Sequence, residues 1–165
     1  MEGVAMETRI VHLGDVSRTV KRAGDLKQEY FAGNHERRLG RAVGVSQFGV
    51  NHVELEPGSM SSLRHWHEGE DELVFVLSGE LTLIDENGAH VLEPGAVVGF
   101  PAGVPNAHHL KNNSRVRASF LVVGTRKVGK ETIHYPDDPL GACIVERDPL
   151  GARILERVTH DEPSD

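Results

Sequence analysis

Short apolar segments separated by turn-forming residues dominate the chain from about residue 42 onward. The apolar segments occupy residues 45–55, 72–84, 89–100 and 115–124, and runs such as EPGS and DENG lie between them. Apolar runs bounded by Gly, Pro, Asn and Asp are typical of strands and hairpins. DENG, at residues 85–88, is the sharpest turn signal, because Asn87 and Gly88 both tolerate the positive φ of a two-residue hairpin turn. The pattern predicts an all-β fold.

The two flanks lack this regularity. Residues 1–41 are mixed and charged, with neither a helical nor a strand period, and we interpret them as a loosely structured N-terminal arm. Residues 42–125 form the predicted β-rich body. Residues 126–165 are a C-terminal extension that begins with an irregular connection rich in Pro, Gly and Asp and contains one more short strand, ARILERV. We expect this extension to pack on the body or on a partner subunit.

Composition narrows the kind of protein and its partners. The 165 residues suit a single domain, and because only 5% are aromatic the core must consist mainly of Val, Leu, Ile and Ala. A net charge of −7 disfavours nucleic acid and anionic lipid surfaces as partners. No secretory leader and no run of ~20 apolar residues is present, so we expect a cytoplasmic protein with no membrane partner. The single cysteine, Cys143, allows no internal disulfide.

Candidate chemistry gathers in the segment between residues 65 and 72. His65 and His67 are two apart, so on a strand their imidazoles project to the same face. Glu72 follows at the head of the apolar run LVFVLSG, where the adjoining strand can bring a carboxylate to the same point. Two neutral imidazoles and one carboxylate form a metal-binding set that leaves coordination positions open. The acidic residues Glu68, Glu70 and Asp71 between them are expected to form a solvated loop.

These residues belong to a longer pattern that resembles the cupin superfamily. Its first signature is similar to Gly58-SMSSLR-His65-Trp-His67-EGED-Glu72-LVFVLS-Gly79, with one extra residue before the first histidine. Its second signature is similar to Gly95-AVVGF-Pro101-Ala-Gly103. The resemblance covers residues 46–124 and implies a double-stranded β-helix, the jelly-roll barrel of cupins, with the arm and the extension added to it.

The resemblance also suggests a fourth ligand, but at a position where the chain departs from the family pattern. The second signature would place that ligand at Asn106, whose neutral amide binds metals weakly. His108, followed by three residues and Asn112, has the spacing that closes the signature, as though two residues were inserted after Gly103. We therefore predict His108 as the fourth ligand, with His109 facing outward, while an irregular backbone there would reverse that choice.

The resemblance leaves the activity open. Elements R-H-W-H (64–67) and H-H-L-x-N (108–112) also occur in a group of small bacterial-type cupins, which supplies no substrate. By analogy, the leading hypothesis is an enzyme that holds one divalent ion (Fe, Mn, Ni or Zn) and acts on a small oxygen-bearing molecule as a dioxygenase, isomerase or decarboxylase. The alternative is a barrel that binds or senses a small molecule without converting it. No catalytic residue beyond the ligands can be assigned, and we expect a homodimer because exposed strand edges in such barrels are usually covered.

Overall fold

The computed structural model describes residues 8–21, 31–137, 141–148 and 151–158. Strands dominate these residues, and helices are limited to a 3-10 turn, η1 (Leu13–Asp15), and one short helix, α1 (Leu39–Val43), among the described residues. All the strand pairings recorded in this part of the chain are antiparallel. The predicted all-β jelly-roll class is confirmed.

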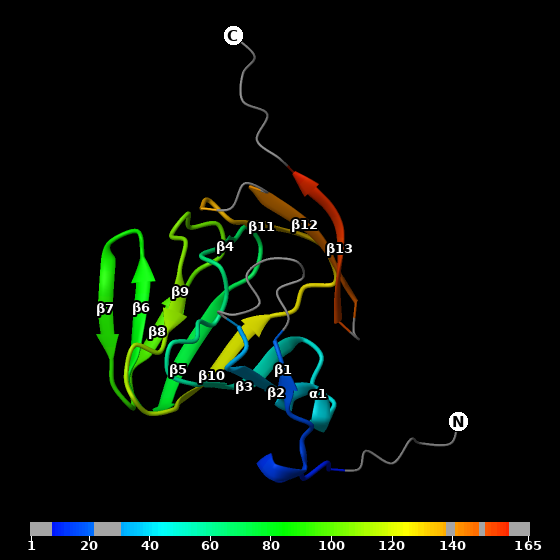
Figure 1. Ribbon diagram of the computed structural model, residues 1–165. Coiled ribbons are helices and arrows are strands. Elements are labelled where there is room, and N and C mark those ends of the chain that lie inside the picture. The colour runs from blue at the N-terminus through cyan, green and yellow to red at the C-terminus, as the bar shows by residue number, and fades with distance from the viewer. Residues whose placement is uncertain (1–7, 22–30, 138–140, 149–150, 159–165) are drawn as a thin grey trace.

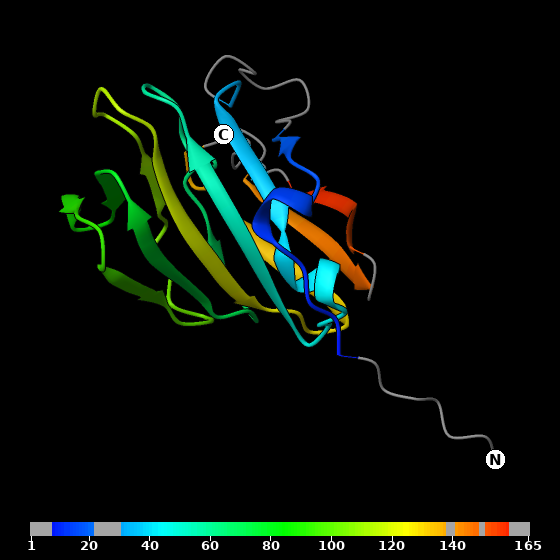
Figure 2. The same cartoon turned by 90° about the horizontal axis from the view of Figure 1, so that it is seen from below.

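The strands form two walls that enclose the core. In spatial order, the first wall consists of β1 (Thr19–Val20), β2 (Asn34–Arg38), β3 (Phe48–Leu55), β10 (Ala118–Thr125), β5 (Glu72–Ser78) and β8 (Val97–Phe100). A smaller sheet is ordered β7 (Gly88–Leu92), β6 (Leu81–Asp85) and β9 (His109–Lys111). A further sheet is ordered β13 (Gly151–Val158), β12 (Ala142–Asp148), β11 (Gly129–His134) and β4 (Trp66–His67). The β6–β7 hairpin and the β12–β13 pair lie at opposite ends of the molecule (Figure 1 and Figure 2).

An isolated pairing between His65 and His108 joins these last two sheets into the second wall. His65 N–H donates to the His108 carbonyl at 3.2 Å, and His108 N–H donates to the His65 carbonyl at 2.9 Å. Residues that exchange both backbone hydrogen bonds lie directly opposite each other and project their side chains to the same face. The connection between the sheets therefore also places two imidazoles side by side.

Alternation along the strands builds the core between the walls. On β5, Val74 and Val76 are buried while Leu73 and Leu77 are 40% exposed, and on β6 Leu81 and Leu83 are buried. This is the period of two expected of half-buried strands. The main cluster unites residues of both walls: Val53, Leu55, Val74, Val76, Leu81, Leu83, Leu92, Phe100, Leu110, Ala118 and Phe120. As the composition predicted, aliphatic side chains make up most of it.

Two tight turns depend on glycine. Asp85 pairs with Gly88, so the predicted hairpin is present, although its two loop residues are Glu86 and Asn87, one position earlier than expected. Gly79, the last glycine of the first cupin-like signature, has φ +70°, and a Cβ there would lie 2.7 Å from the Ala118 Cα. Only glycine fits this position without displacing backbone.

The flanks hold more regular structure than the sequence pattern indicates. In the described part of the arm, β2 pairs with β3 along its whole length and α1 follows it, so this part is not loose. The expected irregular connection contains β11, whose Glu131 and Ile133 are buried. Both strands are short and polar, and pairing with a neighbouring strand supplies the hydrogen bonds that their own sequence does not predict. No helix in the described ranges is long and apolar enough to cross a bilayer.

Truncation of a buried leucine and of an exposed leucine should distinguish the core-facing side of these strands from the solvent-facing side. We expect Leu81→Ala, at a fully buried position, to lower the free energy of unfolding by about 2–5 kcal/mol because it removes packed methyl groups and leaves a cavity. Leu77→Ala, on the exposed face of β5, should cost less than about 1 kcal/mol. Urea unfolding followed by circular dichroism measures both values, and equal losses would contradict this assignment of the core.

Candidate metal centre

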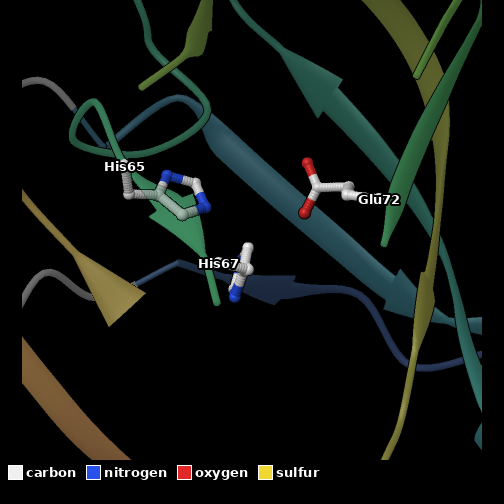
Figure 3. A group of neighbouring side chains, drawn as sticks. All are labelled: His65, His67 and Glu72. Carbon is white, nitrogen blue, oxygen red and sulfur yellow. The ribbon is translucent and has the colours of Figure 1, made fainter. Parts of the chain in front are cut away.

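The residues of the H-x-H motif approach Glu72 from the opposite wall of the barrel. His65 immediately precedes β4 and His67 ends it, in the second wall, whereas Glu72 begins β5 in the first wall. Figure 3 shows the imidazoles on one side and the carboxylate on the other, directed toward the same space. One ligand atom of each residue lies within 4.8 Å of the ligand atoms of the other two. The convergence predicted from strand geometry is thus present in the structure.

The imidazole rings pack against one another and against neighbouring aromatic side chains. The rings of His65 and His67 meet edge to face with centroids 5.0 Å apart, and those of His65 and His108 are 5.1 Å apart. Phe100 stacks on His108 with centroids 3.4 Å apart and planes 2° apart. Tyr135, from the C-terminal extension, stacks on the ring of His65. These contacts restrict the side chains before any ligand binds.

His108, rather than its neighbours, faces the cluster. Its side chain is buried and its Nε2 lies 3.5 Å from the Glu72 Oε1. The Asn106 side chain instead accepts the Glu86 N–H at 3.0 Å and donates to Asp85, so it serves the β6–β7 turn. His109 is half-buried, and its Nδ1 lies 3.1 Å from the Ser62 carbonyl. His109 lines the same cavity as His108, but its ring nitrogen contacts a backbone carbonyl rather than Glu72.

Burial and charge set the ionisation of this cluster. Desolvation lowers the pKa of His65 to about 3, against the attraction of Glu72, which raises it. Burial alone would raise the pKa of Glu72, but the contact with His108 and the charges of the neighbouring histidines outweigh it and lower the pKa to about 2. At neutral pH the cluster therefore combines a neutral His65 imidazole with a carboxylate, which are the protonation states that bind a divalent cation.

A small cavity of about 160 Å³ opens beside the cluster. Its floor is the apolar core, and Glu72, His65 and His108 lie in its wall. Lys21, at the end of the described arm, reaches this cavity and donates from Nζ to the Ser61 carbonyl at 2.8 Å. Loss of hydration lowers the pKa of Lys21, while Glu36 and then Glu72 act to raise it. Sequence reasoning missed Lys21, because an arm without periodicity gives no indication of where it folds back.

The acidic loop after His67 differs from the expectation that it is solvated throughout. Glu68 and Asp71 are exposed, but Glu70 is only 4% exposed and its Oε2 lies 3.9 Å from the His67 Nδ1. Glu131, on β11, is 5% exposed, and its Oε1 lies 3.4 Å from the same nitrogen. The prediction was wrong for Glu70 because the loop turns at Gly69 and folds back against β11.

The described residues fit a single divalent ion. Ligand atoms at ~2.0–2.2 Å from a metal lie about 3 to 4.4 Å from one another, and the ligand atoms of His65, His67 and Glu72 all lie within 4.8 Å of one another. The His108 Nε2 is buried, and no described group satisfies hydrogen-bond geometry with it, so this nitrogen is available to a cation beside Glu72. Imidazole and carboxylate together suit Fe, Mn, Ni or Zn and do not select among them.

Comparison with known proteins identifies the fold family. The family model of the cupin domain matches residues 51–124 of this chain. A solved structure from Silicibacter pomeroyi, named a sugar phosphate isomerase from a cupin superfamily, is 42% identical, with a TM-score of 0.78 over 89% of this chain and 92% of that protein. The chain belongs to the cupin superfamily. This membership agrees with the resemblance that its two signatures indicate.

Further similar structures include a second protein, provisionally named a sugar phosphate isomerase. That protein, from Acidithiobacillus ferrooxidans, is 30% identical with a TM-score of 0.63 and covers 78% of this chain and 81% of its own. The polyketide cyclase RemF from Streptomyces resistomycificus is 24% identical with a TM-score of 0.61, over 73% of this chain and 81% of its own, and shares the fold. No curated protein matches the sequence.

The low pKa of His65 predicts how the metal-free cupin responds to acid. The unfolded state binds a proton on this residue near pH 6.5 and the folded state only near pH 3, so this contribution to stability is present above pH 6.5 and is lost as the pH falls. Between pH 6.5 and 4.5 the loss should be about 2 kcal/mol. His65→Gln should show a correspondingly weaker dependence in urea titrations with chelator, and parallel curves for both proteins would contradict the assignment.

Proposed function

We propose that this cupin is a metal-dependent isomerase of small phosphorylated sugars, with one divalent ion on His65, His67, Glu72 and His108. The observation that carries the proposal is the convergence of imidazoles and a carboxylate from two facing walls on one point beside a small cavity. The substrate class comes from the two relatives of 42% and 30% identity, which both bear the name sugar phosphate isomerase. Isomerisation is redox-neutral, so the site needs no external oxidant.

The donor set suits such a reaction. A bound divalent ion would supply Lewis acidity toward the carbonyl and hydroxyl oxygens of the sugar. The chain itself holds its imidazoles by stacking on Phe100 and Tyr135, which fixes their orientation before substrate arrives. The apolar floor of the cavity, which includes Val74 and Phe120, limits the water around the reacting carbons.

Lys21 provides a partner for an anionic substrate group. Its side chain lines both the inner cavity and the wider groove formed by the described part of the arm, so it stands where the two meet. An ammonium at this point attracts a phosphate to the mouth of the cavity while the sugar carbons enter beside the histidines. A cavity of about 160 Å³ favours a short sugar over a large one.

Turnover by the reconstituted protein tests the proposal. Protein stripped with chelator and loaded separately with Mn, Fe, Ni or Zn is incubated with aldose phosphates of three to six carbons, and ketose formation is followed by NMR. We expect turnover with at least one metal, loss of turnover after chelation, and a loss of at least about 100-fold in His65→Ala and Glu72→Ala, since each removes a donor to the ion. Val91→Ala, which changes an exposed side chain on β7, is the control variant.

The rival function, binding without conversion, gives a different outcome in the same experiment. A binding or sensor barrel would hold one of these molecules tightly, as isothermal titration shows, and return it unchanged with every metal. Consumption of dioxygen with an unphosphorylated substrate would instead favour a dioxygenase. Either result would contradict the proposed isomerase activity and favour the other function instead.

Removal of the charge at Lys21 should affect the phosphorylated substrate selectively. In Lys21→Met, KM should rise about 10- to 100-fold because a charge-assisted hydrogen bond of roughly 1.5–3 kcal/mol is lost. The unphosphorylated sugar should show little change. Lys111→Met, on β9 outside the cavity lining, is the matched control. A uniform effect on both sugars would show that Lys21 does not bind the phosphate.

A further inference from the structure

Two of the histidines are oriented in the same way by their own backbone. The His65 Nδ1 lies 2.9 Å from the carbonyl of Leu63, two residues earlier, and the His108 Nδ1 lies 3.0 Å from the carbonyl of Asn106, again two residues earlier. A carbonyl only accepts, so it selects the tautomer with the proton on Nδ1 and leaves Nε2 to bind a cation. For His108 this nitrogen is the one beside Glu72.

The Nδ1 of His67 faces a different kind of group. The carbonyl two residues before it belongs to His65 and already accepts the His108 N–H at 2.9 Å, in the pairing that joins the sheets. The His67 Nδ1 faces carboxylates instead, with Glu131 Oε1 at 3.4 Å and Glu70 Oε2 at 3.9 Å. At 3.4 Å the nearer contact does not meet hydrogen-bond geometry. Contacts of this kind are often poorly aligned in an unliganded site and tighten when the site is loaded.

Glu131 is the better held of the two carboxylates. The Gly69 N–H donates to its Oε1 at 3.2 Å, and a Cβ at Gly69 would lie 2.7 Å from its Oε2, so the absence of a side chain makes room for the carboxylate. On β11, Ile133 pairs directly with His67, and Glu131 is two residues away on the same face. The contact follows from the register of β11 against β4.

We propose that Glu131 is a positioning residue for the metal centre, which accepts the Nδ1–H of His67 and so directs its Nε2 at the bound cation. This inference rests on the metal site of the proposed function. A carboxylate partner also makes the imidazole a stronger donor than a neutral carbonyl does, so His67 differs electronically from His65 and His108. Glu131 lies outside residues 51–124, the part that matches the cupin domain. The C-terminal extension therefore contributes to the metal centre.

Cobalt binding tests the role of the charge. The apparent Kd of Co(II) is measured by isothermal titration, and the visible absorption of the complex is recorded for wild type, Glu131→Gln and Glu54→Gln. Glu54 is a half-buried carboxylate on β3 in an ion pair with Arg37, outside the cluster. Glu131→Gln should bind Co(II) about 10- to 100-fold more weakly, with shifted absorption bands, while the control retains both properties.

The outcomes separate this inference from the proposed function. If wild-type protein does not bind Co(II), the metal site itself is refuted, and the positioning role with it. If wild type binds and Glu131→Gln binds equally well with the same spectrum, only the role of Glu131 is refuted. Should Glu131→Gln fold poorly, Gly69→Ala displaces the same carboxylate from the other side and must weaken binding.

The tautomer of His67 gives a second readout that needs no metal. In metal-free protein labelled with nitrogen-15, long-range NMR correlations of the imidazole ring report which nitrogen carries the proton. We expect the Nδ1-protonated form in wild type and a shift toward the other form in Glu131→Leu, with His65 unchanged because its backbone partner remains. An unchanged tautomer at His67 would overturn the proposal.

Discussion

The backbone pairing of His65 with His108 is the interaction on which the rest of the site depends. It connects the sheet that contains the β6–β7 hairpin to the sheet formed by the C-terminal strands, and completes the second wall of the barrel. Because directly paired residues project to one face, the same pair of hydrogen bonds brings two imidazoles next to each other. A single structural constraint thus closes the barrel and assembles one half of the candidate metal centre.

The other half comes from the facing wall. Glu72 starts β5, where it pairs with Phe100 on one side and Gly124 on the other, so its backbone is fixed within the sheet. The distance between the walls determines the distance between carboxylate and imidazoles. The geometry of the cluster is therefore linked to core packing, since the side chains that separate the walls, among them Val74 and Phe120, also line the cavity.

The C-terminal extension supports the site from outside the domain shared by cupins. β11 pairs with β4, and Tyr135 stacks on the His65 ring. Trp66, which points away from the cluster, stacks on His134 with centroids 4.1 Å apart, and His134 in turn contacts Glu68 at 2.7 Å. Both faces of β4 are thus in contact with the extension, so the strand that contains the H-x-H motif is held on each side. The described part of the arm also reaches the cavity, where Lys21 forms part of the lining.

Local periodicity was sufficient to predict the fold class, the strands of the body and the cluster of His65, His67 and Glu72. Alternation along 72–84 and the DENG turn depend on neighbours in sequence, and His65, His67 and Glu72 follow from the period of two on a strand together with the cupin signatures. The predictions of a loose structure for the described part of the arm, of an irregular connection around residues 129–134 and of a solvated Glu70 were wrong. β2, β11 and the buried loop depend on partners distant in the chain. The sequence favoured His108 over Asn106 and His109, and the structure places its Nε2 3.5 Å from Glu72. Only the tertiary structure brought Lys21 and Glu131 near the site. Strand register across 60 or more residues is set by packing and pairing, which no local pattern contains.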